Sequence, residues 1–232
     1  MLKEIQTTLK KMGDPAVAAA EQKFFKGTLR AHGIKSAAVG KIAREYFPKI
    51  DAMEKSDVFD LCEKLMASGY MEEFGIASDF TYRIRKKFDR ADFDLFEKWI
   101  AEYVDNWAKC DIFCNHTVAD LVEKFPDLAR RVAGWAKSKN RWVRRAAAVT
   151  FILPARHGKF IDTVFAVADE LLTDTDDMVQ KGYGWALKAA SETQPQAVYD
   201  FVTARVKRMP RTAFRYAIEK LPADMRKKAM GL

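Results

Sequence analysis

The sequence has few cysteines and no long apolar run. No stretch of about 18 residues is both apolar and uncharged, which excludes a membrane-spanning helix. The start of the chain is charged where a signal peptide would have an apolar core, at Lys3, Glu4, Lys10 and Lys11. The cysteines are too sparse for a disulfide-stabilised secreted domain, and they are Cys62, Cys110 and Cys114. We therefore expect a protein of the reducing cytoplasm.

Glycine and proline are also scarce, at 11 and 7 residues, and the alternation typical of strands is almost absent. Apolar residues recur instead at i, i+3, i+4 and i+7, as in residues 58–66 and 164–172, which is the spacing of an amphipathic helix. These patterns predict an all-α chain of roughly a dozen helices. The expected boundaries are Asp14-Pro15, Gly33, Pro48, Ser56, Gly69, Asp89, Pro126, Asn140, Pro154, Gly158, Asp174 to Asp177, Pro195, Pro210 and Pro222.

The second half of the chain repeats itself. Residues 126–158, 159–194 and 195–221 each read as an apolar helix followed by a helix that starts with basic or aromatic residues. Short connections favour antiparallel helix pairs, and a period of this length is typical of an α-solenoid. We expect a single domain over residues 1–232, in which residues 91–232 carry the clearest repeats. Residues 1–90 form N-terminal helices, and two roles stay open for them: capping the solenoid, or contributing to binding through their lysines and arginines.

Positive charge exceeds negative charge, with 40 lysines and arginines against 32 acids and a net charge of +8. Such a balance favours an anionic partner. No single helix concentrates its cations opposite a broad apolar face, so nucleic acid is favoured over a membrane surface. We expect a DNA-binding monomer.

Aromatic and ionic residues form pairs spaced i,i+4, so the members of each pair share one helix face. The pairs recur at intervals of 34 to 36 residues, and they are Trp107 with Asp111, Arg141 with Arg145, and Lys181 with Trp185. At the same offset, Arg215 follows Lys181 after 34 residues. Repeats of one length aim equivalent faces the same way, so this pattern predicts a basic row on a concave face, with one carboxylate in it.

The chain resembles the DNA alkylation repair glycosylases of the AlkD-like family in three motifs. The motifs are Asn106-Trp-Ala-Lys-Cys-Asp111, Arg141-Trp-Val-Arg-Arg145-Ala and Val179-Gln-Lys-Gly-Tyr-Gly-Trp185. The resemblance implies a fold of HEAT-like or ARM-like repeats. It also implies base excision repair, in which N3- or N7-alkylated purines are removed from double-stranded DNA by hydrolysis of the N-glycosidic bond.

Residue by residue, the resemblance implies that Asp111 is the catalytic carboxylate and that Trp107 and Trp185 line the cleft. Arg145 is similar to an arginine that approaches the DNA backbone beside the catalytic site. The segment Lys23-Phe24-Phe25-Lys26 looks like the family's entry segment, but Phe24 stands where a tyrosine is expected. The full set of expected DNA-binding residues is Arg141, Arg144, Arg145, Lys181, Arg215, Lys26 and Phe24.

These residue types suit the chemistry of a cationic lesion. An alkylated purine with a formal positive charge leaves without protonation, so no second carboxylate is needed as a general acid. A fixed anion such as Asp111 stabilises the oxocarbenium character that develops on the sugar, or accepts a proton from the attacking water; both roles remain open. An indole face attracts a desolvated cation by ~2 kcal/mol or more.

Other interpretations stand beside this one. A tryptophan on an amphipathic helix usually belongs to the core, and we keep that interpretation for Trp99, Trp135 and Trp142. The basic row is also compatible with a solvated solenoid surface. No metal site is expected from Cys110, Cys114 and His116, and no phosphate-binding loop indicates a cofactor. Because a fold does not fix an activity, the alternatives are a non-catalytic module for branched or damaged DNA and a scaffold for an acidic protein.

Overall fold

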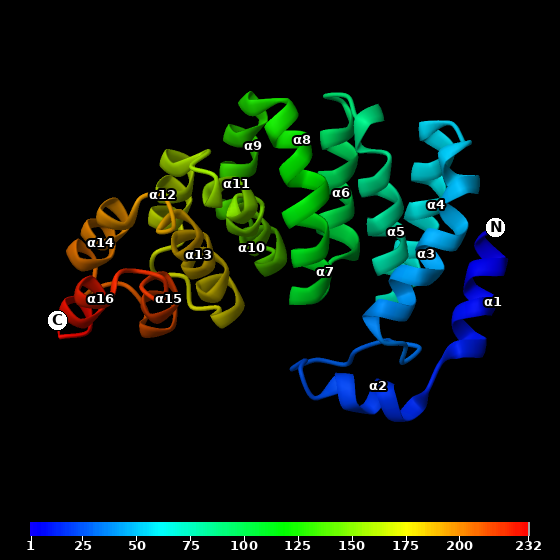
Figure 1. Cartoon of the computed structure of the whole chain (residues 1–232), viewed down its shortest axis with the longest axis horizontal. Coiled ribbons are helices and arrows are strands. Elements are labelled where there is room, and N and C mark those ends of the chain that lie inside the picture. The colour runs from blue at the N-terminus through cyan, green and yellow to red at the C-terminus, as the bar shows by residue number, and fades with distance from the viewer. Residues whose placement is uncertain (232) are drawn as a thin grey trace. The chain divides into compact units, whose positions relative to one another are not determined.

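The computed structural model describes residues 1–231, and within them every regular element is a helix (Figure 1). This confirms the all-α prediction. The chain divides into two compact units, Met1–Ile112 and Phe113–Leu232. The division falls after Ile112 and not near residue 90, where we expected the change in organisation, and the single-domain arrangement stays a prediction. None of the described helices is long and apolar enough to cross a membrane.

The first unit is built around α5, which packs against α3, α4 and α7, while α6 packs against α4. Its core includes edge-to-face aromatic contacts of Phe59 with Phe96 and with Trp99. Trp99 is only 1% exposed, which agrees with its expected place in the core. The elements are α1 (Leu2–Met12), α2 (Pro15–Gln22), α3 (Ser36–Asp51), α4 (Lys55–Ala67), α5 (Met71–Arg83), a 3₁₀ turn (Arg85–Lys87), α6 (Asp92–Tyr103) and α7 (Trp107–Ile112).

A buried carboxylate fixes the loop that joins α2 to α3. Glu72, on α5, accepts hydrogen bonds from the backbone N–H groups of His32, Gly33 and Ile34. Gly33 has φ of +84°, and a Cβ there would lie 2.1 Å from the carbonyl oxygen of Asp14. Only glycine fits this backbone, so the loop takes one path across α5 and α2 is held in place by it.

The second unit is built around α13, which packs against α10, α11, α12, α14 and α15. Its elements are a π-helical segment (Phe113–Val118), α8 (Ala119–Lys124), two 3₁₀ turns (Pro126–Leu128 and Trp135–Lys137), α9 (Ala129–Gly134), α10 (Arg141–Val149), α11 (Ile152–Arg156), α12 (Ile161–Glu170), α13 (Asp177–Ala190), α14 (Pro195–Ala204), α15 (Arg211–Ala217) and α16 (Ala223–Met230).

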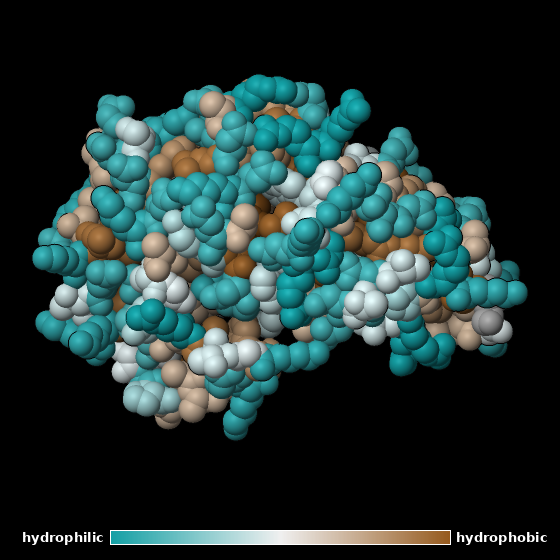
Figure 2. All heavy atoms as spheres, turned by 180° about the vertical axis from the view of Figure 1, so that it is seen from behind, coloured by the Kyte–Doolittle hydropathy of each residue, from teal (hydrophilic) through white to brown (hydrophobic). Residues whose placement is uncertain are grey.

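Seen from behind, mostly hydrophilic side chains cover the molecule, with apolar atoms showing between them (Figure 2).

Equivalent caps begin two helices of the second unit. The Asn140 side chain accepts from the backbone N–H of Trp142 at the start of α10. Asp176, 36 residues later, accepts from the N–H groups of Met178 and Val179 at the start of α13. Such caps satisfy donors that a helix leaves unpaired at its N-terminus. The repeat length predicted from the sequence is therefore present in the local structure as well.

Burial fixes the ionisation of two side chains. Burial, and secondarily the charge of Asp174, raises the pKa of Tyr183 well above its usual range, so the hydroxyl stays protonated and donates to the Leu172 carbonyl at 3.1 Å. Burial likewise raises the pKa of Cys62 to about 12. All three cysteines are buried, as expected for small apolar side chains.

Two expected boundaries and one expected core residue were wrong. Pro48 lies inside α3, which continues to Asp51; near a helix end the missing N–H removes only one hydrogen bond. Pro154 lies in the first turn of α11, where an N–H has no helical partner. Trp142 is only half-buried, and the Arg141 guanidinium lies 4.6 Å from its ring centroid. Trp135 is buried as predicted.

Close packing of α13 on α15 should depend on Gly184. A Cβ at this position would lie 2.8 Å from the Ala213 carbonyl oxygen and 2.8 Å from the Tyr216 Cβ. We expect Gly184→Ala to lower the free energy of unfolding by roughly 1–3 kcal/mol through overpacking, measured by urea denaturation. Gly134→Ala is the control, since nothing lies within 4 Å of a Cβ there, and it should be neutral or stabilising by up to ~1 kcal/mol. Equal effects of the two substitutions would contradict the packing argument.

Candidate active site

The short helix α7 carries both Trp107 and Asp111 of the first unit. They are four residues apart, so they lie on one face one turn from each other. The helix starts at a side-chain cap, because the Asn106 Oδ1 atom accepts from the Lys109 N–H at 3.0 Å. Asp111 is half-buried, and the next residue, Ile112, is 37% exposed. The helix therefore presents an indole and a carboxylate at the surface of its unit.

A buried lysine anchors this helix. The Lys109 side chain is 1% exposed, and its ammonium group donates to the Asp105 carboxylate at 2.9 Å and to the Gly69 carbonyl at 3.1 Å. It also lies 5.5 Å from the centroid of the Phe74 ring. These contacts tie α7 to the turn between α4 and α5. Sequence reasoning missed Lys109, because lysines are rarely fully buried and nothing local marks this one.

The Trp107 indole is held by the segment that follows α2. Its ring stacks on that of Phe25, with centroids 5.4 Å apart and 13° between the planes. Its Nε1–H donates to the Phe24 carbonyl at 3.3 Å. One face of Trp107 is thus covered by this chain itself. The predicted role of Trp107 as a wall of the cleft stays a prediction, and it now concerns the opposite face of the indole.

Gln22 shapes the segment that holds Trp107. Its amide group donates to the carbonyls of Phe25 and Gly27, at 3.3 and 2.8 Å, and its oxygen accepts from the Leu29 N–H at 2.8 Å. The turn fixed in this way leaves the Phe24 side chain 75% exposed. Lys26, also expected to bind DNA, is exposed beside it. Sequence analysis assigned DNA binding to Phe24 and Lys26 but gave no role to Gln22 or Phe25. The role of Phe25 appears only through its contact with Trp107, about 80 residues away.

In the second unit, two of the expected DNA-binding arginines form ion pairs. The Arg141 guanidinium lies 2.8 Å from the Asp176 carboxylate, and that of Arg144 lies 2.6 Å from the Asp174 carboxylate. Arg144 also donates to the carbonyls of Ser138 and Lys139. Each pair joins the start of α10 to the start of α13 or the turn before it. The pairs therefore connect successive repeats, a role that needs no DNA.

Arg145 is buried within the second unit, at 5% exposure. Its guanidinium donates to the Met178 carbonyl, and a Cβ at Gly182 would lie 3.2 Å from its Cγ. Gly182 on α13 therefore leaves the room in which the Arg145 side chain lies. Lys181, on the same helix, is 3.5 Å from the Asp177 carboxylate. Its i,i+4 neighbour Trp185 is half-buried, and its cleft-lining role stays a prediction.

The three aspartates at 174, 176 and 177 thus face the predicted basic row, pairing with Arg144, Arg141 and Lys181 in turn. From sequence we assigned this acidic cluster to a helix boundary. Asp176 does cap α13, but the ion pairs of the three aspartates were not predicted. Arg215, by contrast, is exposed on α15. Among residues 1–231 there is no group of three or more His, Cys, Asp or Glu side chains that could hold a metal ion.

The stacking of Phe25 on Trp107 can be tested by NMR on the indole N–H. Phe25→Ala should move the Trp107 Nε1–H resonance and speed its exchange with solvent, because an aromatic contact worth roughly 0.5–1.5 kcal/mol is lost. Phe25→Tyr keeps the ring and should leave the resonance near its original position. Trp107→Phe assigns the signal. An unchanged spectrum in Phe25→Ala would show that the two rings do not stack in solution.

The ion pair of Arg144 should stabilise the second unit. Asp174 is 9% exposed, so Arg144→Met leaves a nearly buried carboxylate without its partner and should cost roughly 1–3 kcal/mol of unfolding free energy. The control is Arg156→Met, whose pair with Glu192 spans 3.5 Å with both side chains 40% exposed. That exposed pair should contribute at most ~1 kcal/mol. Chemical denaturation measures the unfolding free energy of both variants. Equally small losses in both would contradict a structural role for the ion pair of Arg144.

Comparisons with known proteins agree with these observations. The sequence pattern of the family described as DNA alkylation repair enzyme matches residues 5–221. A predicted DNA alkylation repair enzyme from Enterococcus faecalis is similar in structure, with a TM-score of 0.80, 18% identity, and coverage of 91% of this chain and 98% of that chain. The protein smu.31 from Streptococcus mutans UA159 is similar with a TM-score of 0.60 and 16% identity, over 92% of this chain and 100% of that chain. No curated protein matches the chain in sequence. The structural likenesses confirm the helical-repeat fold.

Proposed function

Because the chain belongs to the family of DNA alkylation repair enzymes, we propose that it is a DNA glycosylase for cationic N3- and N7-alkylpurines in double-stranded DNA. A role in DNA alkylation repair, with DNA as the substrate, follows from the family. The glycosylase reaction and its substrate rest on α7. There the Asp111 carboxylate lies one helical turn from the Trp107 indole. Phe25 covers one face of that indole, and the buried ammonium of Lys109 anchors the helix.

The proposed reaction is hydrolysis at the sugar carbon C1′. The bond from C1′ to the purine nitrogen breaks, and its electron pair neutralises the positive charge of the departing base. A water oxygen forms the new bond to C1′, and the water proton passes to Asp111 or to solvent. Asp111 stabilises the positive charge that develops on the sugar as the base leaves, more in the transition state than in the ground state.

Selectivity for a cationic base follows from the indole. The face of Trp107 opposite Phe25 offers a cation–π contact worth ~2 kcal/mol or more to a desolvated alkylpurine. A neutral base gains no such contact, and it is also a poorer leaving group. The resemblance gives Trp185 the same role. The cation–π contact and the better leaving group both favour the damaged base over the normal one.

We divide the cations between two roles. Lys181, Arg215 and Lys26 are proposed to contact the duplex, together with the exposed aromatic ring of Phe24. Arg145 is buried, so it reaches a phosphate only if its bond to the Met178 carbonyl is released. Arg141 and Arg144 are proposed mainly to join repeats, because each has a carboxylate within 3 Å. A phosphate would have to replace that carboxylate before either arginine could bind DNA bidentately.

The assay is release of 7-methylguanine and 3-methyladenine from methylated duplex DNA. We expect Asp111→Asn to lower the single-turnover rate by about 10²–10³-fold, the usual cost of removing one group aimed at transition-state charge, with little loss of DNA affinity. Asp60→Asn is the matched control, since Asp60 is exposed on α4 of the same unit, and its rate should equal that of the original protein.

Three outcomes separate the candidate functions. Folded protein that binds the duplex but releases no base would favour a non-catalytic module for branched or damaged DNA. Protein that neither binds DNA nor releases base would favour a scaffold for an acidic protein. Full activity in Asp111→Asn would leave a glycosylase whose catalytic carboxylate is another residue.

A further inference from the structure

The net positive charge of this chain belongs almost entirely to its C-terminal end. The last 28 residues contain nine lysines and arginines and two acids, which accounts for +7 of the net charge of +8. The first 204 residues are therefore almost neutral as a whole. The nine cations are Arg205, Lys207, Arg208, Arg211, Arg215, Lys220, Arg226, Lys227 and Lys228.

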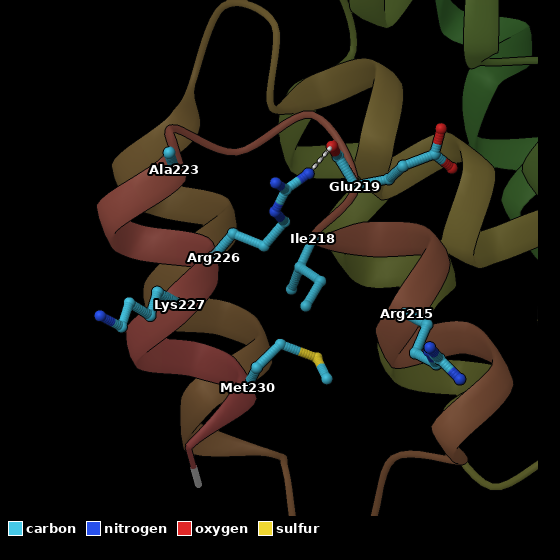
Figure 3. A pocket seen from close by; sticks show the side chains of 7 residues that line it. All are labelled: Arg215, Ile218, Glu219, Ala223, Arg226, Lys227 and Met230. Carbon is cyan, nitrogen blue, oxygen red and sulfur yellow. Dashed lines mark hydrogen bonds between the residues drawn. The ribbon is translucent and has the colours of Figure 1, made fainter.

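A hollow of about 490 Å³ lies between α15 and α16 in this basic region. Figure 3 shows the Arg226 side chain extending from α16 into the space between the two helices, where it donates to the Glu219 carbonyl at 3.5 Å. Arg215 lines the hollow from α15, and Lys227 lines it from α16. Ile218 and Met230 add apolar surface between the cations, and Met230 is 41% exposed.

Arg215, the last residue of the predicted row, and the other cations of this hollow differ in their partners from the cations on α10 and α13. Within residues 1–231, no carboxylate lies within ion-pair distance of Arg215, Arg226 or Lys227. The one carboxylate that lines the hollow, that of Glu219, is 2.7 Å from the Lys188 ammonium. The positive charge of the hollow is therefore available to a ligand, whereas that of Arg141, Arg144 and Lys181 is partly neutralised inside the protein.

We propose that the hollow between α15 and α16 binds the phosphodiester backbone of duplex DNA, through cations that take no part in the proposed reaction. Three cations without acidic partners match phosphate oxygens, and the apolar surface of Ile218 and Met230 suits the adjacent deoxyribose. An anionic membrane is the poorer match, because α16 is polar on nearly all sides and buries only Ala229. This inference rests on the proposed DNA substrate, and it assigns Arg226 and Lys227 to the interface together with Arg215.

The test is the salt dependence of binding to undamaged duplex DNA, followed by fluorescence anisotropy. The double variant Arg226→Gln, Lys227→Gln should lower the magnitude of the slope of log K against log salt by ~1.8, since each neutralised phosphate contributes ~0.9. The affinity at ~0.1 M salt should fall on the order of tenfold to a hundredfold. Both side chains lie at the surface, and circular dichroism checks that the helices persist.

The matched control is Lys41→Gln, Lys64→Gln, which removes the same charge from exposed positions on α3 and α4. Its slope and affinity should stay close to those of the original protein. An equal change in both double variants would show that only net charge matters, and an unchanged slope in the α16 variant would remove the proposal. Loss of binding to phosphatidylserine vesicles, with DNA binding intact, would assign the hollow to membranes and overturn it as well.

Measuring base release distinguishes a failure of this inference from a failure of the proposed reaction. With enzyme in excess and DNA saturated, the α16 variant should excise 7-methylguanine at the original single-turnover rate while needing a higher protein concentration to reach it. A protein that binds duplex through the hollow but releases no base would leave the inference standing and remove the glycosylase. A lower saturated rate would place these cations at the reacting base, against the proposal.

Discussion

The buried ammonium of Lys109 is the interaction on which the candidate site depends. Removing a charge from water is costly, and the cost is offset here by one carboxylate and one carbonyl in direct contact. Asp105 lies just before α7, and Gly69 lies in the α4–α5 turn, so satisfying both partners fixes α7 against that turn. The helical residues continue without a break from α7 into the π-helical segment Phe113–Val118, and Lys109 fixes the start of this helical stretch. Its indole and carboxylate thus owe their positions to a residue that takes no part in chemistry.

The same residue types serve two purposes in this chain, and only the three-dimensional partners distinguish them. Arg145 and Arg215 are both arginines at the equivalent offset of the second helices of repeats. Arg145 is buried and donates to the Met178 carbonyl on α13, whereas Arg215 is exposed next to a hollow lined by further cations. Equal spacing along the sequence therefore predicted equivalent positions correctly but did not predict equivalent environments.

Local signals made much of the fold predictable. Asn140 and Asp176 cap helices, and Pro195 begins one, because capping and proline geometry act within a few residues. The helix boundary predicted at Pro48 was wrong, because a helix packed on its neighbours tolerates one lost hydrogen bond near its end. For the site, the i,i+4 pair of Trp107 and Asp111 was predictable from helical periodicity. The stack on Phe25 and the burial of Arg145 were not, because both are set by contacts between distant segments.

Charge distribution extends this distinction to the whole chain. A cation paired with a carboxylate contributes little to the field beyond a Debye length of about 10 Å, whereas unpaired cations of one sign add together and steer an anionic partner. Nearly all the net charge belongs to residues 205–232, far along the chain from Asp111. In the proposed function, affinity for a duplex and chemistry on a base therefore rest mainly on different residues. The carboxylate needed for the proposed reaction can then remain in a region that is, on balance, almost neutral.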